Sequence, residues 1–382
     1  MTVGRSDGRT AGVIVVAAAL LAVWPSGRLA AQDSQFGIRG LGTPGKWESV
    51  RARSAGGGFA PFDPFSPLMD AALADIRRTS ASVTSGTSWR AVDASGTQSS
   101  LRGTRFPAIT IGGPLVGKIV IAGGFTTYLD RTFGIVTHDT IDLRGTPQPI
   151  TDDVTSDGAV TDLRFAAAMR PRRWVALGAG IHLLTGSSRI VATRTFADSA
   201  NYRTSSSRDE VAYGGKGVSL SALFEVTQDL RVATWWRTDS RLRADLSGRT
   251  VADNDLPVSY GGGILWRAGG QAVFAGSVAW HGWSTAATGD STGGPSAHDT
   301  FNWSAGAELG PATSPIRFGA RGGQLPFGVG KAPTEVGYSA GIGRSFSQGR
   351  GRLDIGLERL QRKGTGLTER VWTLLLGLTV RP

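Results

Sequence analysis

Long segments in which apolar and polar residues alternate with a period of two constrain this chain more than any other feature. Residues 218–226, 301–309, 352–358 and 371–380 each place apolar residues at nearly every second position. Side chains point to opposite faces along a strand, so each segment has one apolar face and one polar or glycine-rich face. The segments run to about nine to 13 residues, whereas strands of soluble proteins usually have about five to six. A tilted strand that crosses a bilayer needs about nine to 11, so the pattern predicts membrane-spanning strands.

The residues between these segments suit a closed barrel. Trp and Tyr residues lie near the segment ends, as in the interfacial girdles of outer-membrane barrels. Short turns alternate with longer polar loops, which we expect at residues 145–158, 196–216 and 284–299. We therefore predict an all-β fold, a transmembrane antiparallel β-barrel over residues 79–382. A secreted sandwich or propeller is the alternative, although the chain shows no fixed-period repeat.

The first 31 residues have the features of a cleaved secretory signal peptide. Arg5 and Arg9 precede an apolar run over residues 11–24, and Ala30 and Ala31 supply small residues before a cut that leaves Gln32 first. The run is shorter than the ~20 residues that a membrane helix needs, although a retained helix is the alternative. We expect residues 1–31 to direct export to a bacterial outer membrane.

Composition argues against several functions. The chain has no Cys, which removes disulfides, cysteine zinc sites, iron–sulfur clusters and thiol catalysis. Its four His are far apart, so we expect no metal and no cofactor. No motif brings a Ser and a carboxylate near a His, so we expect no enzyme. The net charge of +11 comes mostly from Arg residues spread along the chain, which argues against a nucleic-acid site.

Residues 32–78 lack the alternation of apolar and polar residues, so we treat them as an N-terminal segment separate from the barrel. They contain a Gly-rich stretch with Gly56, Gly57 and Gly58. We expect Ser66 and Pro67 to begin a short helix, because Ser is favoured at the N-cap and Pro at the first helical position. A segment too small to fold alone, attached to a barrel, is expected to lie inside the barrel as a plug.

Charged residues fall on the lumen face of the last predicted strands. The alternation places six there: Glu308, Arg317, Arg321, Arg352, Asp354 and Glu358. Opposite charges on neighbouring strands attract, so we expect cross-strand charge ladders that line the lumen. The alternative is that these residues only hold the barrel wall together. Trp235 and Trp236 point to opposite faces, so at most one of them can line the lumen.

Several blocks, taken in order, resemble the FadL-like family of outer-membrane channels. Residues 52–62 are similar to its Gly-rich plug motif, and residues 256–284 to its Leu-Pro opening, Gly-rich strand and Trp-x-x-Trp-Ser strand end. The strands from residue 301 to 360 are similar to the last strands of the family. Residues 66–69 depart from it, because they lack the Asn and Ala of its Asn-Pro-Ala-Gly-like plug signature. The end of the chain departs too, because Pro382 stands where an aromatic residue is common.

The resemblance implies a 14-stranded barrel with an N-terminal plug. It also implies that hydrophobic compounds such as long-chain fatty acids bind inside the barrel and leave sideways through an opening in its wall. Gly and Pro mark strand positions where ladder partners are lost. Gly112, Gly113 and Pro114, expected between two early strands, are therefore the candidate wall bend. An ordinary periplasmic turn is the alternative there.

Together these features predict a passive outer-membrane channel for hydrophobic compounds. One alternative is a non-transporting relative that scaffolds or shuttles secreted proteins, and another is a general pore for polar solutes. As partners we expect hydrophobic small molecules, outer-membrane lipid and the barrel-assembly machinery. We expect no nucleic acid, and we expect the protein to be a monomer.

Overall fold

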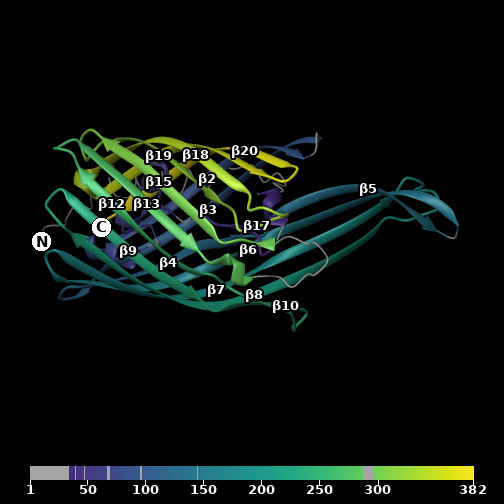
Figure 1. The fold of residues 1–382 in the computed structure, drawn as a ribbon, viewed down its shortest axis with the longest axis horizontal. Helices are drawn as coiled ribbons and strands as arrows, with labels where there is room; N and C mark the ends of the chain where they lie inside the picture. The colour runs from purple at the N-terminus through teal and green to yellow at the C-terminus, as the bar shows by residue number, and fades with distance from the viewer. Residues whose placement is uncertain are drawn as a thin grey trace, which may run out of the picture. The chain divides into compact units, whose positions relative to one another are not determined.

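The computed structural model describes residues 34–38, 40–46, 48–66, 69–94, 97–143, 145–286 and 296–382. The predicted signal peptide and Pro67 lie outside these residues. Figure 1 shows long strands that run side by side through most of the described chain.

Fourteen antiparallel strands of the described chain close into a barrel. In order around the wall they are β2 (Ser80–Ala94), β3 (Thr97–Val116), β4 (Ile119–Asp130), β6 (Thr146–Arg172), β7 (Val175–Phe196), β8 (Ser205–Glu225), β9 (Leu230–Asp239), β12 (Val258–Arg267), β13 (Ala272–His281), β15 (Thr300–Leu309), β16 (Ile316–Gln324), β18 (Thr334–Phe346), β19 (Gly351–Gly364) and β20 (Leu367–Val380). The last strand pairs with the first, from Ala81 opposite Val380 to Ala94 opposite Leu367. The predicted 14-stranded antiparallel barrel is confirmed.

Shorter elements make up the rest. Before the barrel come η1 (Gln35–Ile38), β1 (Thr43–Pro44), α2 (Val50–Arg53), η2 (Ala60–Phe62) and η3 (Asp70–Asp75). Between barrel strands lie β5 (Phe133–Leu143), β10 (Arg241–Leu246), β11 (Arg249–Asp255), η4 (Trp283–Ala286), β14 (Ser296–Ala297), β17 (Phe327–Gly328) and η5 (Ser347–Gly349). No helix in the described residues is long and apolar enough to cross a membrane.

The wall alternates as the sequence pattern predicts. On β20 the side chains of Trp372, Leu374 and Leu376 are exposed on the outside, whereas Thr373 and Leu375 between them are buried inside. Large exposed apolar residues recur on the neighbouring strands around the barrel. A soluble protein rarely exposes so much contiguous apolar surface. An apolar outer band is what the hydrocarbon of a bilayer requires of a barrel.

Strands β5 to β8 extend the barrel sheet beyond the barrel itself, as a projecting sheet (Figure 1). β5 pairs with the first half of β6, and β7 and β8 continue beside it. The polar loops predicted at residues 145–158 and 196–216 are therefore mostly wrong, because residues 146–158 and 205–216 are strand. Many side chains on both faces of this sheet are exposed, so its sequence lacks the alternation that marks the barrel wall.

The projecting sheet also carries an exposed ion pair. Hydrogen bonds from Arg194 to Asp152 lower the pKa of Asp152.

The residues before β2 pack on the lumen face of the barrel. The helix α2 contacts β18 to β20, η2 contacts β9 and β12, and η3 contacts β4 and β6 to β8. The predicted helix starts later than expected, because η3 is a 3-10 helix whose N-cap is Met69. Ser66 instead accepts a hydrogen bond from the backbone nitrogen of Ser49 at 3.0 Å. Its predicted capping role is wrong; Ser49 caps α2.

Glycines in the wall let the plug backbone approach it directly. A Cβ on Gly306 or Gly319 would overlap the backbone of Ala55, which lies in the turn after α2. On the plug side, Gly56 has a φ of 70° and a Cβ there would overlap the backbone of Ala320. Backbone atoms cannot rotate away as a side chain can, so any side chain at these positions would push the plug off the wall.

Gly306→Ala is expected to lower the thermal stability of the barrel. Overpacking of this kind costs about 1–3 kcal/mol, which should lower the temperature at which the folded band disappears in a heat-modifiability gel. Gly276→Ala on the neighbouring β13 is the matched control, because its Cβ would meet only Ser304 O at an ordinary 3.5 Å. Equal melting of the two variants would contradict the close approach.

Candidate functional site in the barrel lumen

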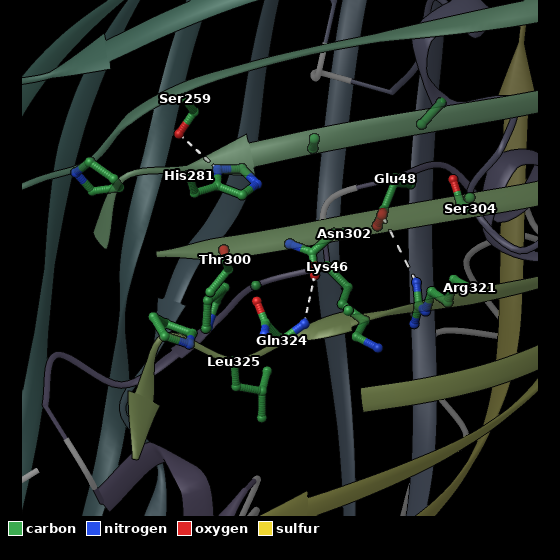
Figure 2. A pocket seen from close by; sticks show the side chains of 18 of the residues that line it. Lys46, Glu48, Ser259, His281, Thr300, Asn302, Ser304, Arg321, Gln324 and Leu325 are labelled. Carbon is green, nitrogen blue, oxygen red and sulfur yellow. Dashed lines mark hydrogen bonds and ion pairs between the residues drawn. The ribbon is translucent and has the colours of Figure 1, made fainter. Parts of the chain in front are cut away.

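A cavity of about 200 Å³ lies in the lumen between the plug and the inner wall. The plug contributes Lys46, Glu48 and the glycines Gly56 and Gly57 to its lining. The wall contributes residues from β4 and from β6 round to β19. Figure 2 shows part of the lining, with side chains from the plug and from several strands converging on one space.

One side of the cavity is aromatic. Trp235 on β9 and Trp283 on η4 are only 5% and 4% exposed. The His281 ring lies 6.1 Å from the Trp235 ring, and its Nδ1 is hydrogen-bonded to Ser259 Oγ at 2.7 Å. Trp283 packs edge-on against Phe327, with 5.5 Å between the ring centroids. Of the pair Trp235 and Trp236, it is therefore Trp235 that faces the lumen, while Trp236 is exposed outside.

Another side presents side-chain amides. Asn302 Oδ1 accepts a hydrogen bond from the backbone nitrogen of Gln324 at 3.1 Å. Gln324 Oε1 accepts one from the backbone nitrogen of Phe301 at 3.3 Å. These bonds use the carbonyl ends of both amides. Within the described chain neither NH₂ group donates to a partner, so each is available to a ligand.

The cations near the plug are paired with carboxylates. Lys46 Nζ lies 2.8 Å from Glu335 Oε1, and Arg362 donates to the other oxygen of Glu335 at 2.7 Å. Arg321 binds Glu358 and lies 3.9 Å from Glu48. Each positive charge at this end of the cavity therefore has a negative charge beside it.

At the opposite end of the cavity the positive charge of Arg237 is likewise paired with carboxylates. Arg237 donates to Asp162 at 2.7 Å and to Asp239 at 2.8 Å, while its guanidinium lies 5.0 Å above the Tyr128 ring. The Tyr128 hydroxyl donates to Asp239 at 2.9 Å. The sequence pattern did not mark this cluster, because its members lie on β4, β6 and β9.

Asp162, His182 and Ser219 form a chain of hydrogen bonds on three adjacent strands. His182 Nδ1 lies 2.8 Å from Asp162, and its Nε2 lies 2.9 Å from Ser219 Oγ. No sequence motif indicated this convergence. The order matches a Ser-His-Asp triad, but Ser219 donates its one proton to Asp70 at 2.6 Å. A carboxylate beside the hydroxyl would also repel an oxyanion, so the chain joins the plug to the wall.

The six predicted lumen charges form ion pairs across the last strands, in one group of four and one pair. Arg317 donates to Glu308 at 2.8 Å and to Asp354 at 2.7 Å. Arg352 donates to Asp354 at 3.2 Å, and Arg321 donates to Glu358. Of the six, only Arg321 lines the cavity described above.

Two plug arginines, which the sequence analysis missed, join these two groups into one network through the plug. Arg51 donates to Glu308 at 3.0 Å, and Arg53 donates to Glu358. Both lie on α2, so the network connects the plug to three strands of the wall. The alternation could locate the wall charges but not their partners on a segment that does not alternate.

The candidate wall bend lies inside β3 rather than between two strands. Gly112 is the last residue of β3 to pair with β2, opposite Ser80, while Gly113 and Pro114 pair with β4. The ladder to β4 shifts register between Pro114 and Val116. The turn itself falls at Gly117, with a φ of 61°, so an ordinary turn at residues 112–114 is wrong.

A longer break in the β3–β4 ladder occurs toward the N-terminal end of β3. The described ladder between β3 and β4 begins at Ala108 opposite Thr126, and residues 97–105 of β3 pair with β2 alone. The freed edge of β4 is taken by the plug: Thr43 pairs with Asp130, and Pro44 pairs with Leu129. Gly45 N then donates to Tyr128 O at 2.9 Å. The wall therefore has a gap there, covered by residues 43–45.

Asp70→Asn is expected to loosen the plug and destabilise the protein. Asp70 is buried with Arg164, which donates to it at 2.7 Å. Removing one partner of a buried ion pair costs about 3–5 kcal/mol, measurable as a fall in the free energy of unfolding in denaturant. Asp152→Asn breaks the exposed pair with Arg194 and is the control, with no measurable loss expected. A similar loss in both variants would contradict the role of the Asp70–Arg164 pair in holding the plug.

No family model matches the chain, and no curated protein matches it in sequence. Solved structures match it in fold. A Pseudomonas aeruginosa FadL homologue matches with a TM-score of 0.62 at 13% identity, over 89% of this chain and 100% of that one. The CymD monoaromatic hydrocarbon channel matches at 0.55 and 14%, over 90% and 98%. The Pseudomonas putida toluene transporter TodX matches at 0.52 and 12%, over 90% and 99%. The resemblance to the FadL-like family is thus confirmed at the level of the fold.

Proposed function

We propose that this protein is a passive channel of a bacterial outer membrane that takes up hydrophobic compounds. Two kinds of observation support the proposal. The fold is that of a FadL homologue and of channels named for monoaromatic hydrocarbons and toluene. The outside of the barrel carries an apolar surface suited to lipid, and the lumen holds a cavity beside the plug.

The gap between β3 and β4 is the observation that carries the proposal furthest. An apolar compound gains about 0.8 kcal/mol per CH₂ by staying out of water. A route that ends in the membrane is therefore more favourable for such a compound than one that ends in water. A sideways exit requires wall strands that have lost their ladder partners. Residues 97–105 of β3 have no ladder partner on β4.

Residues 43–46 of the plug would then control this exit. They occupy the freed edge of β4 from the inside, and Lys46 and Glu335 fix their end. The same residues also line a second, smaller cavity of about 110 Å³, whose lining includes residues of β2 and β4. Residues 44–46 line the main cavity as well, so this segment contacts both cavities.

Two other functions fit less well. A general pore for polar solutes would need an open lumen, but α2, η2 and η3 pack against the inner wall of this one. A barrel that scaffolds or shuttles secreted proteins has one feature in its favour, which is the projecting sheet of β5 to β8. That sheet offers a surface, but it leaves the gap and the cavity without a role.

Uptake by proteoliposomes tests the main proposal. Vesicles with the mature protein should take up a long-chain fatty acid faster than protein-free vesicles, with no gain for a sugar of similar size. Passage of the sugar would make the protein a general pore. Absence of any gain for either compound would contradict transport of long-chain fatty acids.

A reversible disulfide between Thr43→Cys and Asp130→Cys tests the exit. Paired antiparallel residues have Cα atoms about 4.5–5.5 Å apart, which suits a disulfide, and the chain has no other Cys. Oxidation should stop most of the uptake by holding residues 43–45 on β4, and a reductant should restore it. Thr193→Cys with Ser206→Cys, a pair in the projecting sheet, is the control. Full uptake with the first disulfide closed would contradict an exit past this segment.

A further inference from the structure

We infer that the lumen cavity takes a neutral, single-ring aromatic compound with a hydrogen-bonding substituent, such as a phenol. This inference rests on the proposed function and names the substrate class of the same site. The volume of the cavity, its aromatic side and its balanced polar side each narrow the class in a different way.

The volume limits the ligand to about one ring. The cavity measures about 200 Å³. An apolar cavity of about 150 Å³ holds benzene, whereas pockets for drug-sized ligands have about 300–1,000 Å³. A ring with one or two small substituents fits the measured volume. A long acyl chain would have to extend out of the cavity, past the plug or toward the wall gap.

The aromatic side favours a flat ligand. Trp235, His281 and Trp283 reach the cavity from three elements, and aromatic rings pack well in stacked or edge-on arrangements. Phe327 holds Trp283 from behind and Ser259 holds His281 by a hydrogen bond. Since these rings are already ordered, binding a ring against them costs little additional side-chain entropy.

The amide side favours a ligand that can accept hydrogen bonds. The carbonyl ends of Asn302 and Gln324 are held by backbone nitrogens, and their NH₂ groups have no acceptor in the described chain. A phenolic oxygen could accept from either. A bare hydrocarbon would displace water from these donors and leave them unpaired, which costs free energy.

The charge balance favours a neutral ligand. Lys46 and Arg362 are paired with Glu335, and Arg237 is paired with Asp162 and Asp239. Arg321 is likewise paired with Glu358. A carboxylate ligand would find no cation without a partner and would face several carboxylates at close range. Desolvating such a ligand without a free counter-ion is unfavourable.

Calorimetry on the full mature protein in nanodiscs tests this class, with empty nanodiscs as the blank. The probes are p-cresol, toluene and oleate, of which the first two differ by one hydroxyl. We expect p-cresol to bind about tenfold more tightly than toluene, because one hydrogen bond of the usual strength accounts for that ratio. We expect oleate to bind more weakly than p-cresol.

A matched pair of variants assigns the hydroxyl to the amide side. Gln324→Leu should lower the affinity for p-cresol about tenfold and leave that for toluene unchanged. Gln271→Leu, at an exposed turn between β12 and β13, should change neither. Unchanged p-cresol affinity in Gln324→Leu and also in Asn302→Leu would overturn the assignment.

The outcomes separate the inference from the proposed function. Toluene binding as tight as p-cresol binding would overturn the inference and leave a hydrophobic channel standing. Oleate binding without p-cresol binding would do the same, with the long-chain form of the function retained. Absence of binding for all three compounds would overturn the inference and would count against the proposed channel as well.

Discussion

Hydrogen bonding of the backbone in hydrocarbon is the constraint on which the rest of this structure depends. Each backbone group left unpaired in a bilayer costs several kcal/mol. The described chain meets this requirement with a ladder that closes from β20 onto β2. The break between β3 and β4 stands out against that requirement. Residues 43–45 supply backbone partners to the freed edge of β4, so the plug completes the wall at the place where the wall itself does not.

The buried charges of the lumen face also need partners, and the plug supplies some of them. Alternation places polar and charged side chains inside, where there is little room for water. Asp70 and Arg53 on the plug bring opposite charges to Arg164 and Glu358 on the wall. Buried ion pairs add little net stability, but breaking one is costly. We therefore assign these pairs, together with the close approach at Gly306, to fixing the position of the plug rather than to driving folding.

The sequence predicted the wall of this protein better than its interior. A period of two survives wherever one face of a strand meets lipid, so the barrel, its outer face and the charges of Glu308 and Arg317 could all be predicted. The projecting sheet was missed because both its faces meet water. The cluster around Arg237 and His182 was missed because adjacent strands bring together residues far apart in the chain, and no local pattern records that register. Ser66 was wrongly predicted to cap a helix, because its hydrogen-bond partner, the backbone nitrogen of Ser49, lies 17 residues earlier in the plug.

Under the proposed function, a polar cavity inside a channel for hydrophobic compounds has a physical rationale. A passive channel must bind its substrate strongly enough to admit it and weakly enough to release it. If the lumen were as apolar as lipid, an apolar compound would gain nothing by leaving it. Here the aromatic side attracts a ring, while the amides and paired charges keep the cavity less favourable than hydrocarbon for the apolar part of the ligand. In the proposed route, the free energy of that part would then fall from the cavity toward the gap beside β4, which favours release into the membrane.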